Sequence, residues 1–412
     1  MRQPNSANPT RVYSMTESID HDLKVSHTKD ESSRQNFVQG MRAYVLNDLS
    51  GHMKTVWDRK VEPAFEKTNG RTPADGPEIH KTFKPETIFK FYSSMRCNTQ
   101  EMVWRSVMPA VEREGNDLSR RAQVLSQAGD KAEGTVSTDP NFHVPRYTSE
   151  LDVHMMPGNY HEERIDYDVT QGAVFDNGLA VFSFGLLGDR MEDITDSVST
   201  FFQTRYPDEQ PKKILDLGCT LGHSTLPWKA RYPDAEVHGV DVGGPCVRYA
   251  HARAQSYGVT AHFHQMDAEH TDFEDESFDV VYSCMFLHEV PLKNIKGVFK
   301  EAHRLLKPGG VMLHYELPPN SMTSPYDGFY LDWDSYYNKE PFYKAFRDTD
   351  AKAEIEEAGF EKDSFFEHVA PSRNLYGHDV LMDAAKQAGA QNDSRVGRFG
   401  DGVMWYFFGA RK

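Results

Sequence analysis

Two acidic residues and a glycine-bounded turn between them are the residues of this chain best suited to chemistry. An apolar run at residues 214–217 contains Asp216 and is followed by Gly218 and Gly222. Asp241 ends the next apolar run, 19 residues beyond Gly222. A carboxylate at a spacing of about 20 residues can reach the hydroxyls of a bound ribose. A helix that begins at such a turn also presents unpaired N–H groups and a positive dipole end to a ligand.

The turn is a poor match to the fingerprint for dinucleotides. Thr220 lies inside the turn and the middle glycine is missing, although that glycine gives the backbone room for a pyrophosphate. The acid at the strand end also departs from the fingerprint. A ligand with a carboxylate, a sugar and a positive charge suits the site better, and S-adenosylmethionine fits that description.

Strands that alternate with helices are expected to position these residues. Apolar runs bounded by glycine predict the strands, and helical segments such as 221–231 separate them. The alternation predicts an α/β fold with a parallel sheet and right-handed crossovers. The predicted strands are residues 214–217, 236–241, 261–265, 278–283 and 311–317.

This order of motifs resembles the class I S-adenosylmethionine-dependent methyltransferases over roughly residues 195–412. The resemblance implies a Rossmann-like, doubly wound, mostly parallel sheet of seven strands, with residues 402–412 as an antiparallel last strand. It also implies S-adenosylmethionine as the cofactor, with the first turn around its methionine part, Asp241 on the ribose, and Asp267 with Ala268 at the adenine. Thr220 stands where many members have glycine. The implied cofactor-binding residues are Asp216, Gly218, Thr220, Gly222, Asp241, Val242, Asp267, Ala268 and Cys284.

Methyl transfer from a sulfonium is an in-line displacement, so the protein must align the reactants and exclude water. A base is needed only when the acceptor loses a proton. His288 follows the fourth predicted strand directly and is the candidate base, because an imidazole can remove a hydroxyl proton at neutral pH. Glu289 could orient His288 or contact the acceptor. The alternative is that His288 only shapes the pocket, and Glu316 and Tyr315 are weaker candidates for the base.

Two segments are expected to cover the site. Residues 130–190 are rich in Gly, Pro, His and Tyr, and the resemblance implies a lid there. Residues 176–178 within it could form a hairpin turn or belong to a helix–turn–helix. Residues 318–348 form an insertion rich in aromatic rings, which predicts a pocket wall, with a self-packed helical cap or a dimer contact as alternatives.

The N-terminal half predicts a separate helical module, at residues 35–194, after a polar, disordered arm at residues 1–34. Apolar residues at helical spacing predict helices near 38–56 and 88–111, and Pro109 is expected to kink or restart the second. The methyltransferase domain then occupies residues 195–412. A homodimer through the N-terminal helices is an open alternative to a module that caps the site.

Composition limits the partners. The net charge of −16 disfavours a nucleic-acid partner, because an acidic surface repels phosphates. No segment is apolar enough for a membrane span or a signal peptide. The four cysteines form no C-x-x-C pair, and the spacing of His154, His161, Glu162 and Glu163 matches no metal site, so we expect neither a zinc site nor a disulfide framework. The expected location is the cytoplasm.

The sequence therefore predicts an enzyme that methylates a small, apolar or aromatic molecule, with oxygen of a hydroxyl or carboxyl group as the favoured acceptor atom. Carbon or nitrogen is the alternative within the same class. A different class is a catalytically silent subunit that binds S-adenosylmethionine and serves as a regulator or scaffold.

Overall fold

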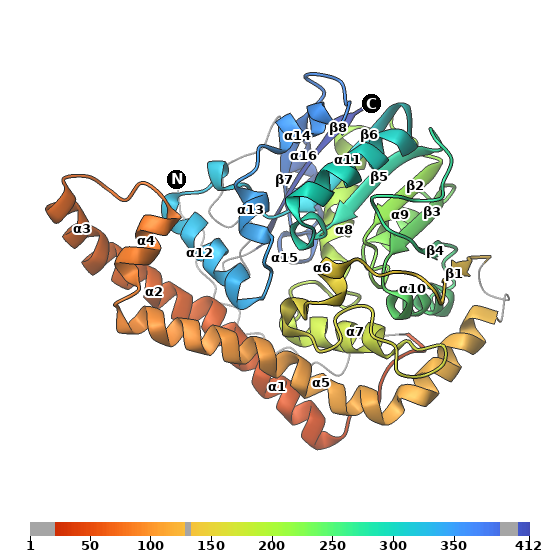
Figure 1. Cartoon of the computed structure of the whole chain (residues 1–412), viewed down its shortest axis with the longest axis horizontal. Coiled ribbons are helices and arrows are strands. Elements are labelled where there is room, and N and C mark those ends of the chain that lie inside the picture. The colour runs from red at the N-terminus through yellow and green to blue at the C-terminus, as the bar shows by residue number, and fades with distance from the viewer. Residues whose placement is uncertain (1–20, 128–132, 388–402) are drawn as a thin grey trace.

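The computed structural model describes residues 21–127, 133–387 and 403–412. One eight-stranded sheet forms the body of the molecule, and long N-terminal helices extend from it to one side (Figure 1). The strand order is β1-β4-β3-β2-β5-β6-β8-β7. The strands are β1 Val136–Ser137, β2 Lys213–Leu217, β3 Glu236–Asp241, β4 His262–Gln265, β5 Phe278–Cys284, β6 Leu306–Glu316, β7 Phe366–Pro371 and β8 Met404–Arg411.

The sheet confirms the predicted α/β architecture. Strands β2 to β6 pair in parallel, and β8 runs antiparallel to both β6 and β7. The order reverses at β2, which lies between β3 and β5, and ligands bind in such sheets beyond the strand ends at this reversal. The predicted number of seven strands is wrong, because the two-residue strand β1 adds an eighth by pairing with the outer edge of β4. A strand this short carries no periodicity in the sequence.

Helices cover both faces of the sheet because its strands are apolar on both sides. Leu215 and Leu217 pack toward α11 and α14, whereas Ile214 packs toward α8 and α9 on the other face. All three side chains are fully buried, as the alternation of a parallel strand requires. The helices of this domain are α8 Asp193–Arg205, α9 Thr225–Arg231, α10 Gly244–Ser256, η5 Leu287–Glu289, α11 Leu292–Leu305, η6 Asn320–Met322, α12 Pro325–Tyr337, α13 Tyr343–Arg347, α14 Ala351–Glu357, α15 Arg373–Tyr376 and α16 His378–Lys386.

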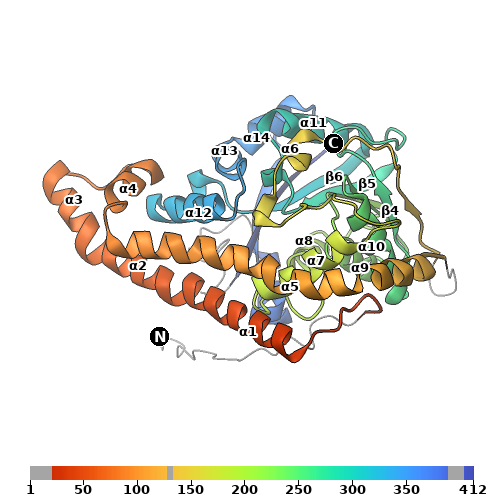
Figure 2. The same cartoon turned by 60° about the horizontal axis from the view of Figure 1, so that its bottom comes forward.

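The N-terminal module is helical, as predicted, and its longest helix, α5, runs past α7 and α10 (Figures 1 and 2). The predicted restart at Pro109 is wrong, because Pro109 lies inside the continuous 41-residue helix α5. Val107, Ala110 and Val111 are buried around Pro109, and their packing outweighs the cost of about 3 kcal/mol for an internal proline. The helices of the module are α1 Lys29–Tyr44, η2 Val45–Leu49, α2 Ser50–Val56, η3 Trp57–Val61, α3 Glu62–Asn69, α4 Gly76–Phe83 and α5 Thr87–Gln127.

The predicted disordered arm is wrong for residues 21–34, and residues 1–20 lie outside the described residues. Leu23 and Val25 are buried in the cluster that joins α5, α7 and α10. Helix α1 begins after Thr28, whose side chain and that of Glu31 form a capping box. Leu23 and Val25 are two apolar residues in a polar stretch, and their packing between these helices holds the segment in place.

Residues 133–190 contain α6 Arg146–Ser149, η4 Val153–Met155 and α7 Thr170–Phe182. Both readings of residues 176–178 are wrong, because the segment lies inside α7. Gly178 is required there by packing rather than by a turn, since a Cβ at this position would overlap the Trp104 ring. Asp176 is buried beside it and accepts hydrogen bonds from His21, His223 and Tyr249.

The aromatic insertion divides between two roles. Tyr326, Phe329 and Trp333 pack against the N-terminal helices in a cluster with Trp57 and Phe83. Tyr330 and Tyr343, in contrast, line the cavity described below. In the described part of the chain, no helix is both long and apolar enough to cross a membrane.

Candidate active site

A cavity of about 260 Å³ lies beyond the ends of β2, β3 and β5, between the sheet and the helices α5, α7 and α12. Four of the predicted site residues do not line the cavity and lie behind its surface. Those four are Asp216, Gly222, Asp267 and Ala268. The predicted site residues that line the cavity are Gly218, Thr220, Asp241, Val242, Cys284, His288 and Glu289.

Asp241 is fixed by the turn that follows β2. Its Oδ2 accepts a hydrogen bond from the Thr220 N–H at 3.0 Å, and its Oδ1 accepts one from the Gly243 N–H at 2.8 Å. Burial raises the pKa of Asp241 to about 6. Gly218 has a φ of +73° and lies against the Phe286 ring, so only glycine fits. Thr220 also has a positive φ, of +45°, which explains why glycine suits this position.

Asp216 supports the same turn from within the core. Its Oδ2 accepts hydrogen bonds from the Ser224 and Thr225 hydroxyls at 2.5 and 2.7 Å, and burial raises its pKa to about 7. Its Oδ1 is buried and has no hydrogen-bond partner in the described part of the protein. Gly222, with a φ of +72°, lets the turn approach the Phe263 ring. Both residues therefore shape the turn rather than the cavity surface.

Asp267 and Ala268 lie beside a residue that sequence reasoning missed. Tyr147 of α6 lines the cavity and packs with the cluster that contains Ala268. Burial, followed by the charges of Asp267 and Asp241, raises the pKa of Tyr147. Asp267 itself accepts a hydrogen bond from the Glu269 N–H at 2.9 Å. The tyrosine is therefore a cavity residue close to the predicted adenine position.

The predicted lid segment contributes a large part of the cavity wall. Its residues reach the cavity from α6, η4, α7 and the adjacent loops. The lining residues of this segment are Tyr147, Thr148, Val153, His154, Asn159, Tyr160, Phe175, Leu179, Phe182 and Leu187. That they close over a bound cofactor stays a prediction.

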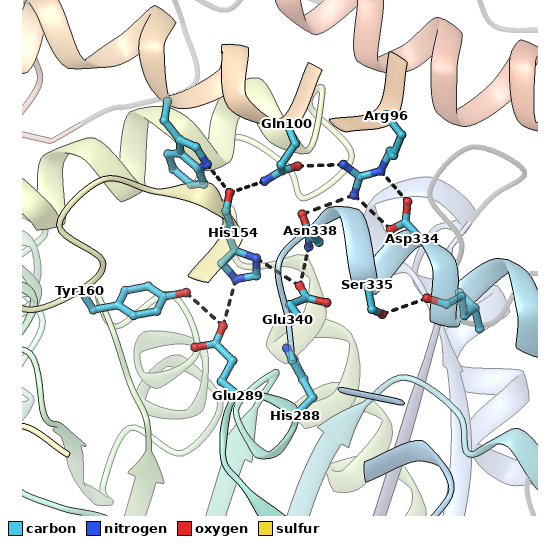
Figure 3. Close-up of polar contacts among 12 residues, drawn as sticks. Arg96, Gln100, His154, Tyr160, His288, Glu289, Asp334, Ser335, Asn338 and Glu340 are labelled. Carbon is cyan, nitrogen blue, oxygen red and sulfur yellow. Dashed lines mark hydrogen bonds and ion pairs between the residues drawn. The ribbon is translucent and has the colours of Figure 1, made fainter. Parts of the chain in front are cut away.

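Glu289 belongs to a charged cluster at the far side of the cavity (Figure 3). The His154 ring contacts two carboxylates, Glu289 Oε1 at 2.9 Å from Nε2 and Glu340 Oε1 at 3.1 Å from Nδ1. The Tyr160 hydroxyl donates to the same Glu289 oxygen at 3.1 Å. Burial alone would lower the pKa of His154, but the two carboxylates raise it to about 10. His154 is therefore a cation at neutral pH.

Sequence analysis assigned no catalytic or binding role to His154. Only the fold brings its ring into contact with Glu289. Among the residues that the structure describes, no group of His, Cys, Asp or Glu could hold a metal ion.

His288 is held in one orientation beside the cavity. Its Nδ1 lies 2.5 Å from Glu316 Oε2, and its ring stacks on Tyr343 with a centroid distance of 4.0 Å. Glu316 is itself fixed, because its Oε1 accepts the Phe286 and Leu287 N–H groups at 3.0 and 2.7 Å. An ionised Glu316 requires the proton on Nδ1, which leaves Nε2 as the acceptor of a neutral ring. Burial lowers the pKa of His288, but Glu316 reverses this and raises it overall.

The two weaker candidates for the base do not line the cavity. Glu316 orients His288, as described above, and is 1% exposed. Tyr315 lies on the other face of β6, where its hydroxyl accepts a hydrogen bond from Trp228 Nε1 at 3.1 Å. Neither can contact an acceptor in this arrangement.

Comparison with known proteins agrees with this geometry. Residues 214–310 match the model of a methyltransferase domain family. The chain therefore contains a methyltransferase domain of the class I, S-adenosylmethionine-dependent type. The chain is 33% identical over 112 residues to a demethylmenaquinone methyltransferase of Thermus thermophilus, and the match covers 27% of this chain and 50% of that protein.

Two further proteins are similar to part of this chain. A sterol 24-C-methyltransferase of Debaryomyces hansenii is 30% identical over 148 residues, 35% of this chain and 38% of that protein. A solved phosphoethanolamine N-methyltransferase 2 of Haemonchus contortus, in complex with S-adenosylmethionine, is 19% identical with a TM-score of 0.39 and covers 57% of each chain. The chain thus spans half or less of the length of these two curated relatives.

The cavity fits S-adenosylmethionine, the cofactor that the methyltransferase domain implies. Asp241 presents a carboxylate whose position is fixed by two backbone N–H groups, which suits a pair of ribose hydroxyls. Gly218 keeps the backbone open beside it. Asp241 lies at the end of β3 and has no cationic partner among the described residues. A cationic sulfonium bound nearby would therefore meet the negative charge of this carboxylate.

Proposed function

We propose that the protein transfers the methyl group of S-adenosylmethionine to a small-molecule acceptor, and that the acceptor atom is oxygen. The observation that carries the choice of oxygen is the pair His288–Glu316 at the cavity that also contains Gly218 and Asp241. A histidine held by a carboxylate is suited to take a proton from a hydroxyl. Carbon and nitrogen acceptors that are already nucleophilic need no such base.

In this mechanism the cofactor supplies an activated methyl group on a sulfonium, and the protein supplies position. The turn from Gly218 to Thr220 and the Asp241 carboxylate hold the cofactor. Nε2 of His288 accepts the hydroxyl proton of the acceptor, and Glu316 stabilises the imidazolium that forms. Helices α5, α7 and α12 surround the cavity and exclude water. Alignment of this kind can contribute about 7–11 kcal/mol.

Nitrogen is the second candidate for the acceptor atom. Glu289 and Glu340 line the same cavity and share one cation, His154. An ammonium group on the acceptor would meet this surplus of negative charge. Proton removal would then fall to a carboxylate or to water, and His288 would only shape the pocket.

The direct test is to incubate the protein with S-adenosylmethionine labelled in its methyl group and an extract of the cell that makes it. The methylated small molecule is then isolated, and its labelled carbon is assigned by NMR to an O-methyl, N-methyl or C-methyl group. An O-methyl product supports the proposal, and an N-methyl or C-methyl product contradicts it. A protein that binds the cofactor tightly but labels nothing would be a regulatory or scaffold subunit.

His288→Asn separates the base from the pocket wall. Asparagine keeps a donor for Glu316 but cannot accept the acceptor's proton, so turnover should fall about 100-fold or more while cofactor affinity stays unchanged. Full activity in this variant would exclude the base role. The cytoplasmic location, the division into arm, cap and catalytic domain, and a homodimer through the N-terminal helices stay predictions.

A further inference from the structure

Arg42 is a buried cation at the cavity with no carboxylate to balance it. The side chain is fully buried and lines the cavity from the C-terminal end of α1. Its Nε donates to the Phe182 carbonyl at 3.0 Å and its Nη1 to Gln100 Oε1 at 2.7 Å. Nη2 has no hydrogen-bond partner in the described residues. A guanidinium this deeply buried is ordinarily paired with a carboxylate, because an unpaired buried charge is costly.

The carboxylates nearby are engaged by other cations. Arg96, which is also buried, holds Asp334 by hydrogen bonds of 2.5 and 3.1 Å. Arg96 also donates to Gln100 Oε1 at 3.0 Å, so one neutral amide oxygen serves two guanidinium groups. Figure 3 shows Arg96, Gln100 and Asp334 grouped on one side of the His154 cluster. Within the group of Arg42, Arg96 and Asp334, two guanidinium groups therefore face one carboxylate.

Arg42 lies on the acceptor side of the cavity. The groups that surround it come from α5 and α12, through Arg96, Tyr330 and Asp334, and from α7, through Phe182. They do not come from the strand ends at which we expect the cofactor. Burial, reinforced by Arg96, lowers the pKa of Arg42 well below its usual range. An anion bound here would offset both the cost of burying the Arg42 charge and the repulsion from Arg96.

The backbone next to Arg42 is also irregular. Helix α1 passes directly into the π-helical turn η2, and Leu46 in that turn lines the cavity together with Arg42. Such turns insert an extra residue at a cost in regularity and often occur at functional sites. Leu46 of this turn and Arg42 of α1, four residues earlier, thus lie at the same wall of the cavity.

We infer that Arg42 recognises an anionic group of the acceptor, a carboxylate or phosphate whose oxygen accepts a hydrogen bond from Nη2. This inference rests on the proposed function and narrows its substrate class to small molecules with an acidic group. The aromatic rings of Phe182, at 4.0 Å from the guanidinium, and Tyr330 would flank the anion.

Paired probes of the same shape test the inference without a known acceptor. The full chain, saturated with S-adenosylhomocysteine, is titrated by calorimetry with benzoate, phenyl phosphate and the uncharged benzamide. We expect the preferred anion to bind about tenfold or more tightly than benzamide, the range for hydrogen bonds to a charged group. Benzoate and phenyl phosphate distinguish the two kinds of oxyanion.

Variants locate the effect. Arg42→Met should abolish the preference for the anion, and Arg42→Lys should weaken anion binding several-fold without changing benzamide binding, because lysine keeps the charge but loses the planar fork. The matched control is Arg113→Met, which removes a tie between α5 and Glu31 of α1 outside the cavity. The control should keep the full preference.

Three results would overturn the inference. The first is equal affinity of the wild-type protein for benzoate, phenyl phosphate and benzamide. The second is a preference that persists in Arg42→Met or, if that variant does not fold, unchanged anion binding in Arg42→Lys. The third is a loss of S-adenosylmethionine affinity in the Arg42 variants with the probe preference intact, which would assign Arg42 to the cofactor's carboxylate. A wild-type protein that binds no S-adenosylhomocysteine would instead refute the proposed function.

Discussion

Asp241→Ala removes the carboxylate that the turn after β2 holds toward the cavity. Each Asp241 oxygen already accepts one backbone N–H, at 3.0 and 2.8 Å, and each has a further lone pair for one ribose hydroxyl. A hydrogen bond to a charged group contributes about 1.5–3 kcal/mol. Two such bonds amount to about 3–6 kcal/mol, so the dissociation constant for S-adenosylmethionine should rise about 100-fold to 10,000-fold.

The assay is calorimetry at pH 7.5, where the Asp241 carboxyl, with its pKa of about 6, is ionised. Asp279→Ala is the matched control, because Asp279 also accepts two backbone N–H groups, from Lys212 and Lys213 at 2.8 Å, but lies at the start of β5 and away from the cavity. The control should bind the cofactor with wild-type affinity. A folded Asp241→Ala protein with a dissociation constant within threefold of the wild type would refute the ribose assignment.

Three other expectations follow from the same structure. Turnover should rise with pH through the pKa of His288, which lies above 6.5, because only the neutral ring accepts a proton; a flat profile across pH 6–9 would contradict the base role. Gly178→Ala should lower the free energy of unfolding by about 1–3 kcal/mol in urea titrations, because its methyl group would overlap Trp104, whereas Gly40→Ala has open space and should be neutral or stabilising. Asp216 binds its proton more tightly in the folded state, so stability should fall by up to about 4 kcal/mol as pH rises from 4 to 7. Asp216→Asn should reduce this slope, and an unchanged slope would count against the raised pKa.

The strand ends that hold the cofactor could be predicted because their signals are local. An apolar run that alternates between two buried faces, a glycine pair and an acid lie within a few residues of one another in β2 and its turn. Such patterns depend on backbone geometry and on burial, which the neighbouring residues themselves determine. A local pattern also produced the wrong prediction at Gly178. Asn177 and Gly178 form a dipeptide typical of hairpins, but here the glycine allows close packing inside a helix.

The residues of the acceptor side could not be predicted in this way. Arg96 and Asp334 form an ion pair across 238 positions of sequence, and His154 meets Glu289 across 135. Each of these side chains alone resembles an ordinary charged residue on a helix or loop. Only their burial beside one cavity distinguishes them, and burial of a polar group depends on which distant elements pack around it.

The sequence by itself therefore determined the parallel strands β2 to β6, the turn after β2 and the acid at the end of β3 that lines the cavity, since these depend on periodicity over a few residues. The tertiary structure decided which charges from α1, α5, η4 and α12 share the cavity with His288. It also decided that Arg42 lacks a counterion there. Local patterns encode the first set, whereas the second exists only when segments far apart in the chain exclude water from the same space.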